Sequence, residues 1–132
     1  MKISMTVLGA DSVIAKARRA PALAGRDPER ITHEYGQRLR DQVRQNASGR
    51  PGPNVVTGQY RAGIRIMEQS RYSVTVGTDA VQSRRLEFGF VGVDAIGRHY
   101  AQPAFPHFRP ASDQVAPQYF QAMRSAARSW WR

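Results

Sequence analysis

The segment from Arg85 to Ala111 restricts the fold of this chain more than any other. It combines three glycines, three prolines and five phenylalanine or tyrosine residues. Helices and central strands tolerate such a density poorly, because proline lacks the backbone N–H and glycine has no side chain to pack. We therefore expect a shaped, irregular segment whose large apolar side chains lie on a surface of the domain or of a neighbouring subunit. These side chains are Leu86, Phe88, Phe90, Tyr100, Phe105 and Phe108.

Length and composition predict a single domain, residues 1–132, that does not enter a membrane. A chain of 132 residues can bury roughly two thirds of the surface that its unfolded form exposes, so no second core is needed. The mean hydropathy is -0.54, and no run approaches the ~20 apolar residues of a membrane helix. The first residues lack the apolar core of a secretion signal, which predicts residence in a cytoplasm. Because the chain has no cysteine, disulfides and thiolate metal sites are excluded.

Arginine provides nearly all of the positive charge. The formal net charge is +10, and the only lysines are Lys2 and Lys16. Arginine forms planar, bidentate contacts with carboxylates and phosphates, so an arginine-rich surface suits acidic protein partners or DNA. A GC-rich genome would give the same composition, and the arginines are spread along the chain rather than gathered in one block. The composition therefore leaves a functional and a purely compositional origin open.

The N-terminal part of the chain predicts a strand and a short helix. Lys2–Leu8 alternates apolar and polar residues, which is typical of a half-buried strand at the edge of a sheet. Asp11 or Ser12 can cap a short helix that runs towards Leu23. Residues 24–26 then form a linker.

A long helix is predicted after this linker. Asp27 can cap its N-terminus, and Pro28 suits its first turn. An apolar residue then recurs at every fourth position, which we interpret as a stripe packed on the sheet rather than as a coiled-coil seam. The stripe consists of Ile31, Tyr35, Leu39, Val43 and Ala47. His33 falls on the solvent side, and the Gly- and Pro-rich segment 46–56 that follows is expected to be a mobile loop.

A hairpin and a second short helix are predicted next. Ile64–Glu68 and Tyr72–Val76 alternate as two antiparallel strands joined by a turn at Ser70–Arg71. Asp79 can cap a short helix that reaches Phe88. Gly89 ends this helix, because glycine accepts the left-handed conformation that such an end requires.

An extended aromatic and proline-rich arm, at about residues 90–110, precedes the final helix. Within it, Phe90–Val93 and Arg98–Tyr100 could pair as a loose hairpin around a turn. The final helix is expected to begin near Pro110 or after Pro117. Its apolar positions are Val115 or Ala116, Phe120, Met123, Ala127 and Trp130. The predicted class is α+β, with an antiparallel sheet of about 3–5 strands on which the long helix and the C-terminal helix pack.

The sequence shows no arrangement typical of catalysis or of metal binding. It has no nucleophile elbow, no zinc-protease motif, no phosphate-binding loop and no dinucleotide fingerprint. His99 and His107, with Asp94 nearby, match no spacing of metal ligands or of a hydrolase. Glu87 follows two arginines and is interpreted as their ion-pair partner. We therefore predict no catalytic, metal or cofactor-binding residue.

Four short segments, in this order, resemble a known family. They are Thr57–Ile64 (TGQYRAGI), Val76–Thr78 (VGT), Leu86–Gly89 (LEFG) and Pro106–Ala111 (PHFRPA). Together they are similar to the small tail-completion, or head-to-tail joining, proteins of tailed phages, the HK-ninety-seven-type tail-component family. The sequence departs from the family pattern at Gly63, where serine is common, and at His107, where an aromatic residue is usual.

The resemblance implies a virion protein without enzymatic activity. It would form a homo-oligomeric ring, which we expect to be six-fold, at the neck between tail and head, after a period in the host cytoplasm. Its partners would be the tail-terminator and head-connector proteins, with DNA in the lumen, no membrane and no cofactor. The predicted subunit or partner contacts are Phe88, Phe90, Val91, Val93, Arg98, Tyr100, Phe105, Phe108, Arg109, Trp130 and Trp131.

Two alternatives stay open at this point. The first is an arginine-rich DNA-binding accessory protein, although the sequence has neither a basic recognition helix nor an aromatic platform on strands. The second is a nuclease-like enzyme that uses His99 and His107.

Overall fold

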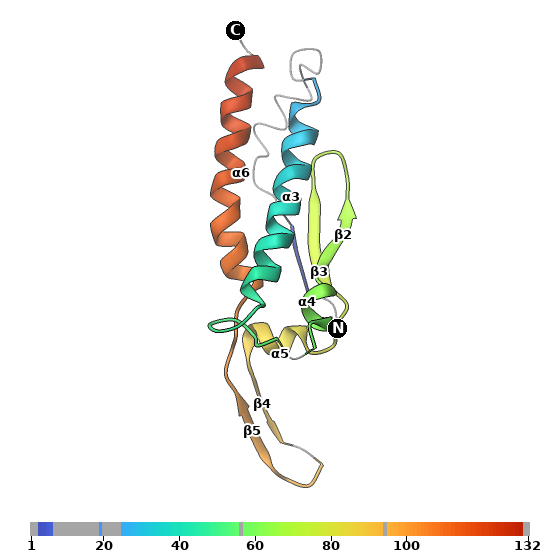
Figure 1. The fold of residues 1–132 in the computed structure, drawn as a ribbon, viewed down its shortest axis with the longest axis vertical. Coiled ribbons are helices and arrows are strands. Elements are labelled where there is room, and N and C mark those ends of the chain that lie inside the picture. The colour runs from blue at the N-terminus through green and yellow to red at the C-terminus, as the bar shows by residue number, and fades with distance from the viewer. Residues whose placement is uncertain (1–2, 7–18, 20–24, 56, 94, 131–132) are drawn as a thin grey trace.

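A computed structural model describes residues 3–6, 19, 25–55, 57–93 and 95–130. The molecule is elongated: two long helices lie side by side, a small sheet flanks one of them, and a narrow hairpin extends from one end (Figure 1). The elements follow in the order β1 (Ile3–Thr6), α3 (Asp27–Asn46), α4 (Gln59–Ala62), β2 (Arg65–Gln69), β3 (Val74–Thr78), α5 (Ser83–Phe88), β4 (Phe90–Val93), β5 (His99–Gln102) and α6 (Phe108–Trp130). The predicted short helix towards Leu23 lies outside the described residues except for Arg19.

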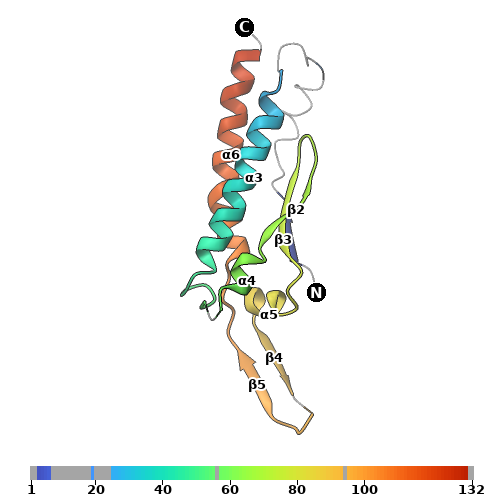
Figure 2. The same cartoon turned by 45° about the vertical axis from the view of Figure 1, so that its right-hand side comes forward.

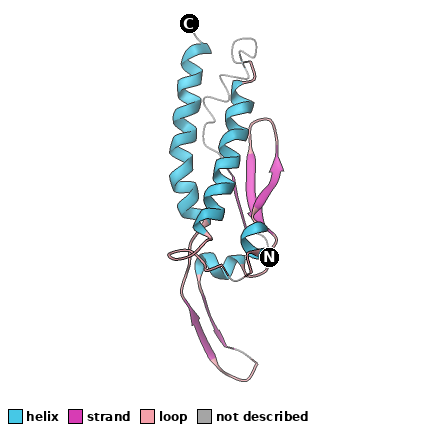
Figure 3. Ribbon diagram, in the orientation of Figure 1, coloured by secondary structure: helices cyan, strands magenta, loops and turns pink. Residues whose placement is uncertain are grey.

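The strands form two separate antiparallel groups, as the magenta arrows of Figure 3 show. In the first, the order is β1-β3-β2, so β1 is an edge strand as predicted. In the second, β4 pairs with β5 alone. The register between β2 and β3 shifts at Met67, since Ile66 pairs with Val76 whereas Glu68 pairs with Thr75. The predicted alternation of Ile64–Glu68 therefore breaks at a bulge. The α+β class is confirmed.

Helix α3 begins at its predicted cap residue, so the actual cap lies one residue earlier. Arg26 occupies the N-cap position, and Asp27 is the first helical residue, so the prediction of an Asp27 cap was wrong. Pro28 lies in the first turn as expected. Glu34 accepts a hydrogen bond of 3.0 Å from Arg38 one turn later, which supports an exposed helix by a few tenths of a kcal/mol.

The predicted apolar stripe of α3 lies in the core, but the sheet is only one of its neighbours. Four of its five residues are buried and Tyr35 is half-buried. Helix α3 packs against both α6 and β3, so the stripe serves a helix–helix contact as well. On the sheet side, a Cβ at Gly36 would lie 2.5 Å from Cγ1 of Val74, which shows how closely helix and strand approach.

Helix α6 begins at Phe108, two residues before the first predicted start. Pro110 therefore lies in its first turn, where the missing N–H costs nothing, and Pro117 lies inside the helix on its exposed side. No described helix is both long and apolar enough to cross a membrane.

The two long helices are antiparallel and are joined by side chains at both ends. Near one end, Nδ2 of Asn46 donates a hydrogen bond of 3.2 Å to the carbonyl oxygen of His107. At the other end, Nε1 of Trp130 donates one of 3.4 Å to Oδ2 of Asp27. A side chain at the end of each helix thus contacts the start of the other.

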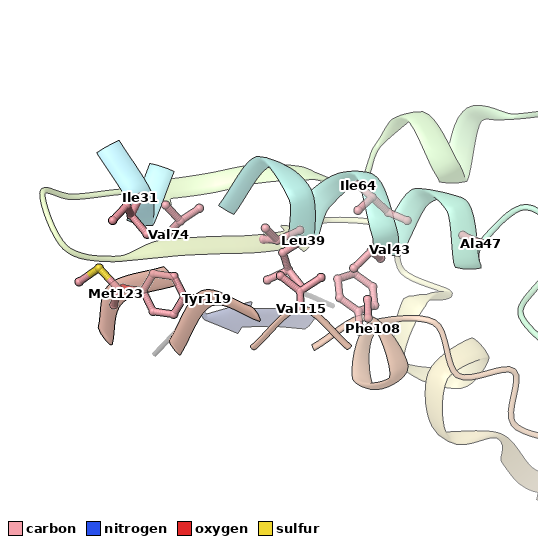
Figure 4. Close-up of a cluster of buried hydrophobic side chains, with 12 residues drawn as sticks. Ile31, Leu39, Val43, Ala47, Ile64, Val74, Phe108, Val115, Tyr119 and Met123 are labelled. Atoms are coloured by element: carbon pink, nitrogen blue, oxygen red, sulfur yellow. The ribbon is translucent and has the colours of Figure 1, made fainter. Parts of the chain in front are cut away.

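The hydrophobic core lies between α3, α6 and the sheet (Figure 4). Tyr119, which the apolar pattern missed, is fully buried there. Its hydroxyl shares a hydrogen bond of 2.9 Å with the buried hydroxyl of Thr32, so two polar groups of facing helices satisfy each other. The core residues are Ile31, Leu39, Val43, Ala47, Ile64, Val74, Val76, Phe108, Ala111, Val115, Tyr119 and Met123.

Candidate interaction arm and the buried network at its base

The hairpin of β4, β5 and the turn between them, residues 90–102, projects from the body and is called the arm hairpin here. Figures 1 and 2 both show it extending beyond α4 and α5, away from the long helices. Its strands pair Val91 with Ala101 and Val93 with His99. Side chains two positions apart on a strand point to the same side, so one face of the ribbon carries both valines. Val91 is 84% exposed and Val93 is 58% exposed.

The opposite face of the arm hairpin is partly covered by its own side chains. Phe90 is half-buried, and the guanidinium of Arg85 lies 4.1 Å from the centre of its ring. A Cβ at Gly92 would lie 2.4 Å from the tip of the Phe90 ring, so the ring lies across this glycine. The arm hairpin therefore has a face shielded by an aromatic ring and a face on which valines meet solvent.

A buried carboxylate holds the base of the arm hairpin. Glu87, at the end of α5, is 4% exposed. Its Oε2 accepts hydrogen bonds from the backbone N–H groups of His107 (2.8 Å) and Phe108 (3.0 Å), and its Oε1 accepts one from that of Arg109 (2.9 Å). The first N–H groups of a helix have no partner within the helix, so Glu87 caps α6 from another element. The prediction that it pairs with the preceding arginines was wrong, because its side chain turns inward to α6.

His107 extends this arrangement into a network with Glu87 and Tyr60, which we call the base network. The imidazole is fully buried. Its Nδ1 lies 3.0 Å from Oε2 of Glu87 and 2.9 Å from the carbonyl oxygen of Phe105, and its Nε2 lies 2.6 Å from the Tyr60 hydroxyl. Because both neighbours of Nδ1 can only accept, Nδ1 carries the proton and Nε2 accepts from the tyrosine.

The electrostatics of the base network keep Glu87 ionised. Burial raises the pKa of its carboxyl group, but the hydrogen bonds from the His107 side chain and from three backbone N–H groups outweigh burial and lower this pKa to about 2. Burial, with a smaller contribution from the Glu87 charge, raises the pKa of Tyr60 well above its ordinary value. The tyrosine therefore stays protonated and remains a donor to His107.

The base network joins three of the four segments singled out in the sequence. Tyr60 belongs to the first segment, Glu87 to the third and His107 to the fourth. Gly89 has a φ of 77° as predicted, and a Cβ there would lie 2.8 Å from the carbonyl oxygen of Gln102. Only glycine allows the returning strand to approach this closely.

The structure separates the predicted contact residues into three groups. Exposed side chains are Phe88, Val91, Val93, Arg98, Tyr100 and Arg109. Half-buried ones are Phe90 and Phe105, each with an arginine stacked on its ring. Phe108 and Trp130 are 1% and 3% exposed, so these two predictions are corrected: their rings pack inside the chain. Trp131 lies outside the described residues.

Some exposed apolar residues escaped the sequence prediction. Val81 is 77% exposed, Ile96 75% and Val55 43%. Ile96 lies in the turn of the arm hairpin. An apolar residue beside Gly97 is the sequence signal that could have identified it as a contact residue. The base network was missed because it depends on contacts between residues 20 and 47 positions apart.

The described residues do not bring together a metal site or a hydrolase pair. His107 is buried in the base network, whereas His99 is exposed on β5. Within the described ranges, no three histidine, aspartate or glutamate side chains are grouped so that they could hold a metal ion.

Comparison with known proteins places the chain in a phage family. A family model described as HK97-gp10-like, "Bacteriophage HK97-gp10, putative tail-component", matches residues 11–89. This match includes α3 to α5 and the first three segments discussed above, and it ends at Gly89, before the arm hairpin. No curated protein and no solved structure matches the chain. Since the match covers more than half of its residues, the chain belongs to the HK97-gp10-like family of bacteriophage tail components.

Proposed function

We propose that this chain is a tail-completion component that forms a homo-oligomeric ring at the phage neck and joins the tail to the head. The arm hairpin carries the proposal. A two-stranded hairpin is marginally stable in water on its own, and this one projects from the body and carries two exposed valines. In a structural protein of a phage tail, we expect such a surface to be covered by another polypeptide.

The shape of the chain favours ring contacts between unlike faces. A contact in which the arm hairpin of one copy meets the body of another copy uses two different surfaces. Such heterologous contacts close into rings when the rotation between copies allows it. Phe88 and Arg109, which are exposed near the base of the arm hairpin, remain available for tail-terminator or head-connector proteins. The role is structural, without catalysis.

Phage particles made without this protein test the proposal. We expect filled heads and finished tails to accumulate separately in electron micrographs, and the wild-type gene supplied in trans to restore joined particles. A V91K/V93K variant should fail to restore them, whereas Q118K/Q121K, on the exposed side of α6, should succeed. Joined particles in the absence of the protein would rule out the proposed function.

A DNA-binding accessory protein is the second candidate, and two arginines favour it. Arg44 is held by the carbonyl oxygens of Ile64 (2.8 Å) and Ala62 (3.4 Å), and Arg61 by the hydroxyl of Ser48 (3.1 Å). Neither guanidinium forms an ion pair with a carboxylate of the described residues. Both could therefore contact phosphate.

A salt titration separates the two candidates. Binding to duplex DNA through phosphates weakens with a log-log slope of about -0.9 per contact. A tail-joining subunit should show no appreciable affinity for free duplex at physiological salt. A slope that decreases by about one contact in R44Q or R61Q would instead support the accessory protein.

A further inference from the structure

The exposed side of α6 differs in charge from that of α3. Helix α3 carries four arginines and four carboxylates, and each of these carboxylates forms an ion pair with an arginine. Helix α6 carries three arginines and a single carboxylate, Asp113. The part of its exposed side between Asp113 and Ser129 is called the α6 face here. The polar residues of the α6 face are Gln114, Gln118, Gln121, Arg124, Ser125 and Arg128.

Two arginines of the α6 face, Arg124 and Arg128, have their guanidinium groups available. Both side chains are exposed, and their spacing of four positions places them on the same side of the helix. Neither forms an ion pair, a hydrogen bond or a ring contact with a residue that the structure describes. Arg44 and Arg61 differ, because they already donate to carbonyl and hydroxyl oxygens. A guanidinium has five N–H donors, so the α6 face offers two complete sets to a ligand.

The carboxylates nearest to these two arginines in the described fold do not cancel their charge. Asp113 precedes Arg124 by eleven positions, or about 16 Å along the helix axis, which exceeds the Debye length of about 8 Å at physiological salt. Asp27 approaches the same end of α6 through its hydrogen bond from Trp130. It pairs with Arg30 at 3.4 Å, so its charge is already compensated on α3.

The α6 face lacks the exposed apolar residues that a protein partner would bury. The large apolar side chains exposed in the described part of the chain lie at Val55, at Val81 and Phe88, and in the arm hairpin, and none belongs to α6. Interfaces between proteins have an apolar core, whereas interfaces with DNA are more polar and much more positively charged. Glutamine and serine are among the side chains that bind phosphate oxygens. The composition of the α6 face therefore favours a phosphate backbone over an acidic protein.

The position of α6 separates this face from the surface proposed for protein partners. In both views α6 runs along one side of the molecule, with α3 and the sheet on its other side (Figures 1 and 2). The arm hairpin extends from the end of the body at which α6 begins, whereas Arg124 and Arg128 lie towards the other end of this helix. One copy can therefore contact protein and DNA at the same time.

We infer that the α6 face contacts the phosphate backbone of duplex DNA through Arg124 and Arg128. The inference rests on the proposed function, because a ring at the neck would surround the DNA that is expected in its lumen. Two phosphate contacts per copy are too few for appreciable binding of a single subunit at physiological salt. Several copies in a ring act on one duplex together, so their contacts reinforce each other.

A salt titration of purified variants tests the contact. Binding to a fluorescein-labelled duplex is followed by anisotropy from about 0.01 to 0.1 M salt, over which the Debye length falls from about 30 to about 10 Å. R124Q/R128Q should reduce the slope of log K against log salt by about 1.8, which is about 0.9 for each lost contact, and should do so for duplexes of any sequence. Q118K/Q121K adds two cations to the α6 face and should make the slope steeper.

R30Q/R38Q is the matched control, because it removes the same charge from the exposed side of α3, where both arginines pair with Glu34. Its slope should equal that of the wild type. An equal reduction in R30Q/R38Q would show that net charge alone binds DNA, and it would overturn the inference. A wild-type protein that does not bind the duplex at the lowest salt, or a slope that falls only in R44Q/R61Q, would overturn it as well.

Photocross-linking tests the contact in particles. Replacing Gln121 by p-benzoylphenylalanine puts a reactive group on the α6 face, and the same replacement of Gln37 puts it on the exposed side of α3. After irradiation of joined, DNA-filled particles, the variant at Gln121 should carry covalently attached radiolabelled genome, and the variant at Gln37 should not. Cross-links from position 121 to another protein alone would assign the α6 face to a protein partner and overturn the inference.

The outcomes separate this inference from the proposed function. Particles that join normally but give no cross-link from position 121 to DNA overturn the inference and leave the neck function intact. Heads and tails that join without the protein remove the proposed function. In that case the slopes measured on the purified variants still decide whether the α6 face binds phosphate.

Discussion

The backbone N–H of His107 donates a hydrogen bond of 2.8 Å to Oε2 of Glu87, and this bond closes the base of the arm hairpin. The two residues lie on either side of the hairpin in the sequence, one at the end of α5 and the other immediately before α6. Their contact fixes the direction in which the arm hairpin leaves the body.

Replacing Glu87 by glutamine should destabilise the fold. The E87Q side chain retains one acceptor oxygen but turns an NH2 group towards backbone N–H donors, so part of the α6 cap is lost. We expect the free energy of unfolding to fall by about 1–3 kcal/mol. Urea denaturation measures this change, with E68Q on the exposed part of β2 as the control. Equal stability of E87Q and wild type would show that the cap is not important.

The same carboxylate should make stability depend on acid pH. Its pKa is lowered from 4.5 in the unfolded chain to about 2 in the fold. A depressed pKa contributes stability that is complete above about pH 4.5 and is lost as the pH falls through about 2. The difference in unfolding free energy between wild type and E87Q should therefore shrink across this window. A difference that stays constant down to pH 2 would contradict the role of the charge.

Replacing Tyr60 by phenylalanine should weaken the base network from its other side. The change leaves Nε2 of the buried His107 without its donor, which costs about 1–3 kcal/mol. Thermal and urea unfolding of Y60F would measure the loss. Y35F is the matched control, because Tyr35 is half-buried and its hydroxyl forms no hydrogen bond with a residue that the structure describes. If both variants lose the same stability, the Tyr60 hydroxyl has no special role.

A methyl group at Gly36 should strain the contact between α3 and β3. In G36A the new Cβ would lie 2.5–2.7 Å from three atoms of the Val74 side chain, including its Cβ. Overpacking of this kind costs about 1–3 kcal/mol, which exceeds the ~1 kcal/mol that alanine gains over glycine in a helix. In a V74A background the same change should cost nothing or stabilise. A double-mutant cycle by urea denaturation tests this, and additive effects would refute the steric explanation.

A charge on the exposed face of the arm hairpin should leave the isolated chain intact. Val91 is 84% exposed, so V91K should change the free energy of unfolding by no more than about 0.5 kcal/mol. Circular dichroism and urea denaturation would establish this. The variant then reports on assembly alone, because any loss of joined particles cannot be attributed to unfolding. A large loss of stability in V91K would mean that Val91 packs on the body.

The sequence predicted the elements whose signals are local. The stripe of α3, the β2–β3 hairpin and Gly89 follow from period, alternation and a glycine at a required positive φ. The start of α6 was wrong because Glu87, far away in the sequence, supplies the cap and allows the helix to begin before its prolines. A local pattern contains no information on a cap that arrives from another element.

The predicted contact residues show the same limit of local sequence patterns. An aromatic residue near prolines can serve either an interface or the core, and only the three-dimensional packing separates Phe88, which is exposed, from Phe108, which is buried. The family resemblance indicated the general role of the chain. It could not place single side chains, and it did not identify Ile96.

One hydrogen bond at each end of the α3–α6 pair holds the two long helices together. These bonds run from Asn46 to His107 and from Trp130 to Asp27. A force on the arm hairpin is transmitted to α6 through the backbone N–H groups that Glu87 binds. The two hydrogen bonds between the helices transmit part of this force to α3. The subunit should therefore move as one rigid body, so that a rotation imposed on the arm hairpin also turns the distant ends of both long helices.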